Sequence, residues 1–160
     1  MIKYILFIIL ILICLYVYSY YLYPKNEVII QTTLNNFKLD MLLEKQPIII
    51  QDNIVNLNQI IDAWFKYNSN TKFVLNSSES WNKNKYKYLL FKTDTESEII
   101  IYSPTKKLIN GLPDTNEKLT LIKMSEGQIL ILPFNWLYNI QSSYNLNCVG
   151  INDFVTNLLP

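Results

Sequence analysis

Residues 126–140 read EGQILILPFNWLYNI, from Glu126 to Ile140. The apolar run 128–133 begins after Gly127 and ends at Pro133, two residue types that mark turns and strand ends. We therefore predict a strand over 128–133, followed by a turn that leads to Trp136 and Tyr138. This is the most specific pattern in the chain, and the other elements are placed around it.

Short β-prone segments recur along the rest of the chain. Residues 47–52 (PIIIQD) are rich in β-branched side chains and bounded by Pro47 and Asn53, which predicts a buried strand. Further strands are predicted over 28–31, 73–75, 86–93, 98–103, 119–124 and 146–151. Short strands separated by polar, Pro or Gly turns favour a β-sandwich or a barrel.

Two helices are predicted ahead of most of these strands. Residues 34–45 have the spacing of a short amphipathic helix that ends before Pro47. Residues 57–67 form a second helix that Asn56 or Asn58 can cap. Its apolar residues lie on one face, as expected for a helix packed on a sheet: Leu57, Ile60, Ile61, Trp64 and Phe65. Core packing therefore explains Trp64 better than a binding role.

The N-terminal segment is apolar and carries no charge from Tyr4 to Pro24, with Lys3 and Lys25 on either side. About 20 such residues are enough for a helix to span a bilayer, so we predict a transmembrane signal anchor over 1–25, with 4–24 in the lipid bilayer. A cleaved signal peptide fits less well because no small-residue cleavage site follows. Five tyrosines are expected to form an interface belt: Tyr16, Tyr18, Tyr20, Tyr21 and Tyr23. The single domain, 26–160, is expected on the non-cytosolic side.

The composition excludes several kinds of chemistry. The 14 basic residues are all Lys, against 13 acidic residues, and the chain contains neither His nor Arg. Without His, no Ser-His-Asp or Cys-His site and no imidazole-bound metal can form. A nearly neutral charge balance without Arg argues against nucleic acid as a partner.

The two cysteines are predicted to stay unpaired. Cys14 lies in the predicted anchor and Cys148 in the domain, where a buried small hydrophobe is expected. Asn76 begins a glycosylation sequon, which matters only if the domain faces a secretory lumen. The abundance of Ile, Asn, Lys and Tyr is typical of A+T-rich coding and suggests a large DNA virus or a protist, with a virion or host membrane as the location.

The segment 126–140 resembles the second half-motif of the cupin and Jumonji-C-like double-stranded β-helix. In that motif a Gly opens a strand, a Pro ends it and a Trp precedes a metal-binding His, and Gly127, Pro133 and Trp136 have the matching spacing. Residues 37–52 (FKLDMLLEKQPIIIQD) resemble the helix and strand with which Jumonji-C-like hydroxylases enter the domain. The resemblance implies a mainly β, α+β fold: a jelly-roll barrel preceded by short helices.

The sequence departs from the family at the residues that carry its chemistry. Tyr138 stands where the family has its His, Asn135 replaces the usual turn Gly, and the first motif, His-x-Asp/Glu, is absent. No residue can be assigned to hold 2-oxoglutarate. We therefore expect a degenerate cupin-like shell with no metal, no cofactor and no iron-dependent oxygenase activity, in which Trp136 and Tyr138 fill the remnant pocket.

Two functions follow from these features. The first is a single-pass membrane protein whose non-catalytic domain is a structural or protein-interaction module, with another protein as its partner. The alternative is a small-molecule-binding protein or an enzyme that uses residues other than His. Its candidate residues are the pocket tyrosines and a carboxylate group: Tyr138, Tyr86, Tyr88 and Tyr102, and Asp94, Glu96 and Glu98.

Overall fold

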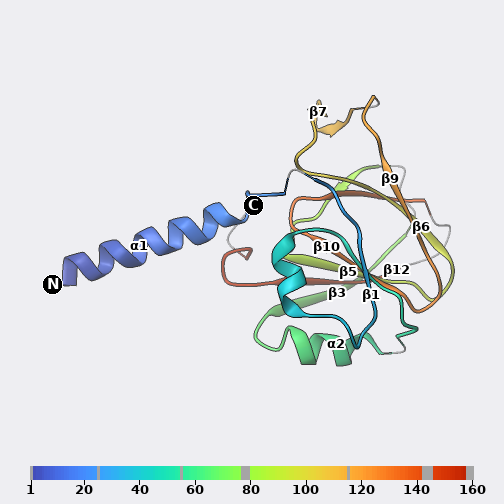
Figure 1. Ribbon diagram of the computed structural model, residues 1–160, viewed down its shortest axis with the longest axis horizontal. Helices are drawn as coiled ribbons and strands as arrows, with labels where there is room; N and C mark the ends of the chain where they lie inside the picture. The colour runs from blue at the N-terminus through green and yellow to red at the C-terminus, as the bar shows by residue number, and fades with distance from the viewer. Residues whose placement is uncertain are drawn as a thin grey trace.

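The structure is a computed structural model that describes residues 2–24, 26–54, 56–76, 80–114, 116–141 and 146–157. One helix, α1 (Ile2–Ser19), projects from a body built mainly of β-sheets (Figure 1). The body also contains a short 3-10 helix, η1 (Leu39–Glu44), and one α-helix, α2 (Leu57–Trp64). Most of the described body is therefore organised by strand pairing.

The larger sheet has six strands in the order β1-β2-β10-β5-β12-β3. These strands are β1 (Ile30–Thr32), β2 (Ile48–Ile50), β10 (Ile129–Pro133), β5 (Tyr88–Lys92), β12 (Leu146–Asn152) and β3 (Ser69–Leu75). Only the pairing of β1 with β2 is parallel. Strand β10 lies inside this sheet, with Leu130 opposite Ile49 on one side and Phe91 on the other.

The smaller sheet has four strands in the order β4-β11-β6-β9. These strands are β4 (Asn82–Lys83), β11 (Leu137–Ile140), β6 (Ser97–Tyr102) and β9 (Thr120–Met124), all antiparallel. A separate ribbon pairs β7 (Leu108–Ile109) with β8 (Leu112–Pro113). Its turn residues Asn110 and Gly111 both have positive φ, 53° and 82°, as tight hairpin turns require.

The larger sheet is buried on both faces, which gives the body three layers. Side chains alternate along β10, so Leu130 and Leu132 enter the core between the two sheets. Ile129 and Ile131 enter a second core on the opposite face, together with Ile60 of α2. That second core also includes residues of η1 and α2: Leu42, Ile61 and Phe65. The aliphatic run in β10 is thus enclosed by the rest of the same chain.

The helix α2 confirms the prediction for 57–67 and ends three residues earlier. Its N-cap is Asn56, whose side chain accepts a hydrogen bond from the Asn58 backbone N–H at 3.0 Å. Trp64 stacks on Phe37 with ring centroids 3.9 Å apart, which is a packing role. The predicted helix over 34–45 is wrong in type and length. Only η1 forms there, and it ends at Lys45 in a left-handed conformation with φ 53°.

The predicted cupin-like jelly-roll barrel is wrong. Over the described ranges the strands form two sheets and a ribbon, and no closed barrel is present: β1 and β3 are the edges of one sheet, and β4 and β9 are the edges of the other. The physical reason lies in the larger sheet, which is apolar on both faces. It therefore becomes a central layer between the smaller sheet on one side and η1 and α2 on the other.

The predicted transmembrane helix over 4–24 is also wrong, and with it the single-pass membrane location. Among the described residues, no helix combines the length and apolar character that crossing a membrane requires. The helix stops at Ser19, where the chain turns at Tyr20 and Tyr21. From Tyr4 to Ser19 it is about 24 Å long, against about 30 Å of hydrocarbon. Lys25, the predicted flank, lies outside the described residues.

Candidate functional site at the base of the N-terminal helix

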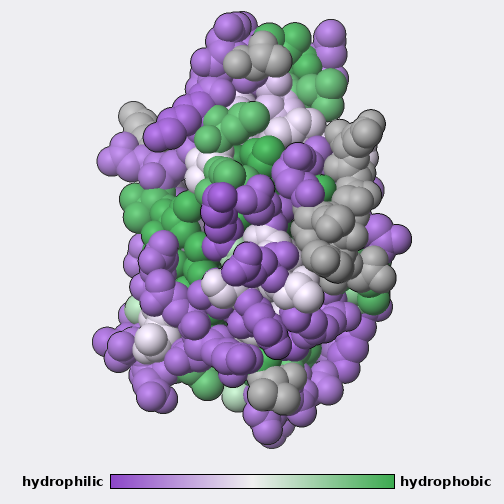
Figure 2. Space-filling model, turned by 90° about the vertical axis from the view of Figure 1, so that its right-hand side faces the viewer, coloured by the Kyte–Doolittle hydropathy of each residue, from purple (hydrophilic) through white to green (hydrophobic). Residues whose placement is uncertain are grey.

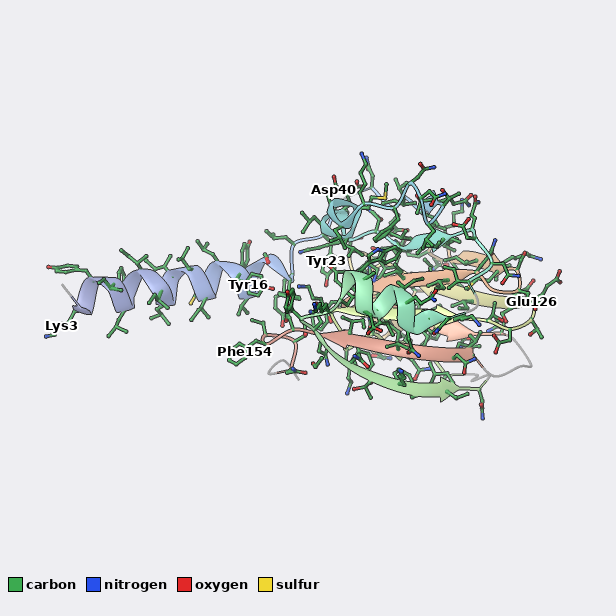
Figure 3. All side chains as sticks on the ribbon, turned by 90° about the horizontal axis from the view of Figure 1, so that it is seen from below. Lys3, Tyr16, Tyr23, Asp40, Glu126 and Phe154 are labelled. Carbon is green, nitrogen blue, oxygen red and sulfur yellow. The ribbon has the colours of Figure 1, made fainter. Side chains whose placement is uncertain are left out.

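The C-terminal end of α1 is fixed to the body by a small apolar contact. Tyr20 is 7% exposed and packs with Phe134 and Val155, and Val17 borders the same cluster. The rings of Tyr20 and Tyr21 meet Phe134 edge-on, with centroids 5.8 and 6.2 Å apart. Figure 3 shows Tyr16 and Tyr23 at this junction, with Lys3 at the far end of the helix.

A carboxylate lies at the centre of the polar part of this contact. Asp153 Oδ2 accepts hydrogen bonds from Tyr16 Oη at 2.6 Å, from Lys87 Nζ at 2.8 Å and from Tyr20 Oη. Its other oxygen, Oδ1, accepts from the backbone N–H groups of Val155 and Thr156. We call Tyr16, Tyr20, Lys87 and Asp153 the Asp153 clamp. It joins α1 to Lys87, near the middle of the body's sequence, and to Asp153, which follows the last strand β12.

The clamp sets the charge state of its members. Burial alone would raise the pKa of Asp153, but the hydrogen bonds from Lys87, Tyr16 and Tyr20 outweigh it and hold that pKa well below its usual range. Burial and the bond to Asp153 raise the pKa of the Tyr20 phenol far above its usual range. Burial opposes the charge on Lys87, but the Asp153 carboxylate prevails and raises the Lys87 pKa. At neutral pH the Asp153 carboxylate is therefore charged, the Lys87 ammonium beside it is charged, and the Tyr20 phenol is neutral.

Lys45 forms a second connection between α1 and the body. Its Nζ donates to the backbone carbonyls of Ser19 and Leu22, at 2.7 Å for Leu22. A cation at this position stabilises the free carbonyls at a helix C-terminus. Burial lowers the Lys45 pKa. Tyr23 lies under the same ammonium, 5.5 Å from ring centroid to Nζ, and donates to the Phe134 carbonyl at 3.0 Å.

A half-open cavity of about 120 Å³ lies between α1 and the body at this junction. Its walls are mostly apolar and are supplied by the end of α1, the η1 segment and the ends of β5 and β10. The lining residues are Tyr16, Ser19, Tyr20, Tyr23, Leu42, Leu43, Lys45, Lys87, Tyr88, Pro133 and Phe134. Of the predicted pocket tyrosines, only Tyr88 borders this cavity.

Trp136 and Tyr138, the predicted remnant pocket, are packed in the core between the sheets. They are 3% and 6% exposed, and the Trp136 indole N–H donates to the Lys45 carbonyl at 3.3 Å. The Tyr138 ring meets Phe91 edge-on at 5.1 Å, and burial raises the Tyr138 pKa. Asn135, in place of the family's turn Gly, adopts φ 65°, a conformation that Asn tolerates.

The other predicted tyrosines do not converge on one site. Tyr86 borders the core between the sheets, where its ring stacks on Phe73 at 5.6 Å and covers Gly150. Tyr88 packs in the second core, on the other face of the larger sheet. Tyr102 is fully buried and donates to the Lys107 carbonyl at 2.6 Å. Tyr86 and Tyr138 therefore lie at the core between the sheets, Tyr88 lies at the second core, and Tyr102 belongs to neither.

The predicted carboxylate group is also dispersed. Asp94 pairs with Lys92 at 2.6 Å, and Glu98 pairs with Lys123 at 2.8 Å. Glu96 lies exposed in the turn between β5 and β6. The described residues contain no group of three or more acidic or thiol side chains placed to hold a metal ion. Paired carboxylates of this kind are typical of a solvated surface.

The two thiols differ in accessibility. Cys148 is 1% exposed, and burial raises its pKa to about 12, whereas Cys14 is exposed on α1. Asn76 is exposed at the end of β3, and the rest of its sequon, Ser77 and Ser78, lies outside the described residues. Cys14 is therefore the more reactive of the two thiols.

Comparison of the chain with family models, curated proteins and solved structures found no match. The resemblance to cupin and Jumonji-C-like domains thus depends on the sequence alone, on the spacing of Gly127, Pro133 and Trp136 and on residues 37–52. A viral source and an origin as a degenerate enzyme have no support beyond the composition. The site at the base of α1 must be interpreted from its own geometry.

Proposed function

We propose that the chain is a non-catalytic protein-interaction module whose β-rich body presents α1 for insertion into a partner protein. One observation carries this proposal: every large apolar side chain from Tyr4 to Leu15 remains 42–76% exposed. These side chains form one contiguous exposed apolar surface, whereas the exposed apolar residues of an ordinary protein surface are scattered singly. In contrast, the face of the body turned away from α1 is mainly hydrophilic (Figure 2).

The distribution of apolar residues around α1 defines the kind of partner. Ten consecutive positions, 4–13, are apolar or aromatic, and at about 100° per residue they cover every side of the helix. A coiled-coil seam needs only one apolar stripe. A helix that is apolar all round is typically enclosed. The partner therefore offers an apolar groove that surrounds α1, with a polar end near Lys3.

The available area argues against a second copy of the chain as this partner. The free part of α1, residues 4–15, presents a side surface of roughly 570 Å², from a length of about 18 Å and a diameter of about 10 Å. Contact along a single stripe of about 100° would cover about 160 Å² of it. A stable interface covers about 800 Å² on each side. A groove that encloses the free part of α1 supplies most of that area, whereas a pair of α1 helices in contact along one stripe supplies only a small part of it.

The Asp153 clamp makes α1 suitable for this role. Asp153 accepts hydrogen bonds from Tyr16 in the last turn of α1 and from Tyr20 directly after the helix, so the helix leaves the body in a fixed direction. A preorganised binding element loses less conformational entropy on association than a flexible one. The body therefore contributes to affinity by orienting the helix, without contacting the partner itself.

The exposed thiol of Cys14 allows a direct test. A benzophenone maleimide attached to Cys14 is irradiated in an extract of the cells that make the protein. The expected result is one discrete protein adduct that excess unlabelled chain displaces. A competitor carrying Leu6→Lys and Leu10→Lys is expected not to displace it, because those charges cannot enter an apolar groove.

A matched probe on the body provides the control. In the variant Cys14→Ser with Val74→Cys, the label sits on a side chain that is 55% exposed on β3. This probe is expected to give no competable adduct. The proposal is refuted if both probes capture the same proteins, or if Cys14 labels only lipid or a second copy of the chain.

A further inference from the structure

The cavity at the base of α1 has the size and lining of a small-ligand site. Its volume of about 120 Å³ approaches that of an apolar cavity of about 150 Å³ that is known to hold benzene. Five aromatic side chains line it, among them Tyr20, Tyr23 and Phe134, together with aliphatic residues that include Leu42 and Pro133. These walls fit one six-membered ring, because aromatic faces and edges pack well against another ring.

The charges around the cavity are unbalanced. Its described lining contains two ammonium groups, Lys45 and Lys87, and no carboxylate. Lys87 is paired with Asp153 outside the lining. Lys45 donates to two backbone carbonyls, those of Ser19 and Leu22, and an ammonium has three N–H donors. Besides these carbonyls, the ammonium lies 5.5 Å from the centroid of the Tyr23 ring, so its third N–H donor has no oxygen acceptor among the described residues.

We propose that this cavity binds a small aromatic carboxylate of the size of benzoate. The ring lies among Tyr20, Tyr23 and Phe134, and a carboxylate oxygen accepts the remaining N–H of Lys45. An anion here compensates a cation that burial has partly desolvated, which makes the hydrogen bond stronger than a neutral one. Because Tyr20 directly follows α1 and Phe134 belongs to the body, the ligand also joins the base of the helix to the body. This inference is independent of the partner proposed for α1.

Titration of the purified full-length chain with benzoate, followed by protein NMR, tests the proposal. Saturable shifts are expected for resonances around the cavity. Benzyl alcohol, which keeps the ring and lacks the charge, is expected to bind at least about tenfold more weakly, as is benzoate to Lys45→Met. Lys107→Met removes an exposed lysine away from the cavity and is expected to leave the benzoate affinity unchanged.

A second variant is needed because Lys45→Met also removes the hydrogen bonds from Lys45 to the Ser19 and Leu22 carbonyls at the base of α1. Ser19→Phe places a ring in the cavity and keeps Lys45, so benzoate binding is expected to disappear while the melting temperature stays close to that of the wild type. The proposal is overturned if benzoate does not saturate. It is also overturned if folded Lys45→Met or Ser19→Phe binds benzoate as the wild type does, or if Lys107→Met weakens binding equally.

Discussion

The strand β10 and the helix α1 are both nearly uninterrupted apolar runs, yet β10 is buried and most of α1 is exposed. From Ile129 to Leu132 every side chain of β10 is 0% exposed, whereas the large apolar side chains of α1 from Tyr4 to Leu15 are 42–76% exposed. The difference comes from their neighbours. Strand β10 has a sheet partner on each side and an apolar layer above and below, all supplied by the same chain.

The comparison shows what an apolar run does and does not specify. Hydropathy indicates that water must be excluded from the run, since burial of apolar surface is the main favourable term in folding. It does not indicate which molecule excludes it. For β10 the answer lies within the chain, and for α1 only the last turns are covered, by Phe134, Val155 and the Asp153 clamp. The rest of α1 is the basis of the proposed function.

The largest expected effect is a difference in the free energy of unfolding between a truncation in β10 and a truncation in α1. Leu130→Ala opens a cavity between the sheets and is expected to lower the free energy of unfolding by about 2–5 kcal/mol. Leu10→Ala removes a side chain that is 57% exposed, so the change is expected to stay within about 0.5 kcal/mol. Urea unfolding of both variants measures the difference. Similar losses would show that α1 is already covered in the isolated chain and would remove the basis of the proposed function.

A smaller effect is expected at the Asp153 clamp. Asp153→Asn leaves the partly buried Lys87 ammonium without its anion and is expected to lower the free energy of unfolding by about 1–3 kcal/mol. Hydrogen exchange is expected to speed up in the last turn of α1 and to stay slow in β10. Adding Lys87→Met removes the unpaired cation, so the double variant is expected to lose less than the two single changes together. Equal loss of protection in β10 would mean that the clamp supports the whole body.

The same clamp predicts how stability depends on pH. The folded-state pKa of Asp153 is lowered, so its contribution is complete above the unfolded value of about 4 and decreases as the pH falls below it. The pKa values of Tyr20 and Lys87 are raised, so their contributions are complete below about pH 10 and are lost above it. Urea midpoints of wild type and Asp153→Asn are expected to differ most at pH 7, and the difference is expected to shrink steadily as the pH falls below about 4 toward the lowered folded-state pKa of Asp153. A constant difference would assign the stabilisation to another group.

Local patterns in the sequence were enough to predict most of the elements. The strands predicted over 128–133 and 146–151 are confirmed as β10 and β12, because each combines an apolar run with clear turn residues. Strand β11 and the short strands β4, β7 and β8 were missed, since two to four residues carry too little pattern. Barrel closure was predicted wrongly because the sequence of a strand with an apolar face is the same whether a helix or another sheet covers that face.

The candidate site was much harder to predict than the elements. Tyr16 and Tyr20 were interpreted as a belt at a membrane interface, and nothing near them in the sequence points to Asp153, which is more than 130 positions away. Lys45 and Lys87 are two of fourteen lysines, with no motif to distinguish them. Trp136 and Tyr138 were chosen through a resemblance, and the structure places them in the core. Sites built from distant, common residue types become visible only once the chain is folded.

The smallest expected effect concerns α2, the helix that covers the outer face of β10 and has no counterpart over α1. Asn56→Ala removes the acceptor for the Asn58 backbone N–H and is expected to lower the free energy of unfolding by about 1 kcal/mol. Asn58→Ala is the matched control, because its side chain only accepts from Lys72 at the surface, and a change within about 0.5 kcal/mol is expected. Urea unfolding distinguishes the two. If both variants are neutral, the enclosure of Ile129 and Ile131 depends on apolar packing, to which Ile60 and Ile61 contribute, and the N-cap of α2 adds no measurable stability to it.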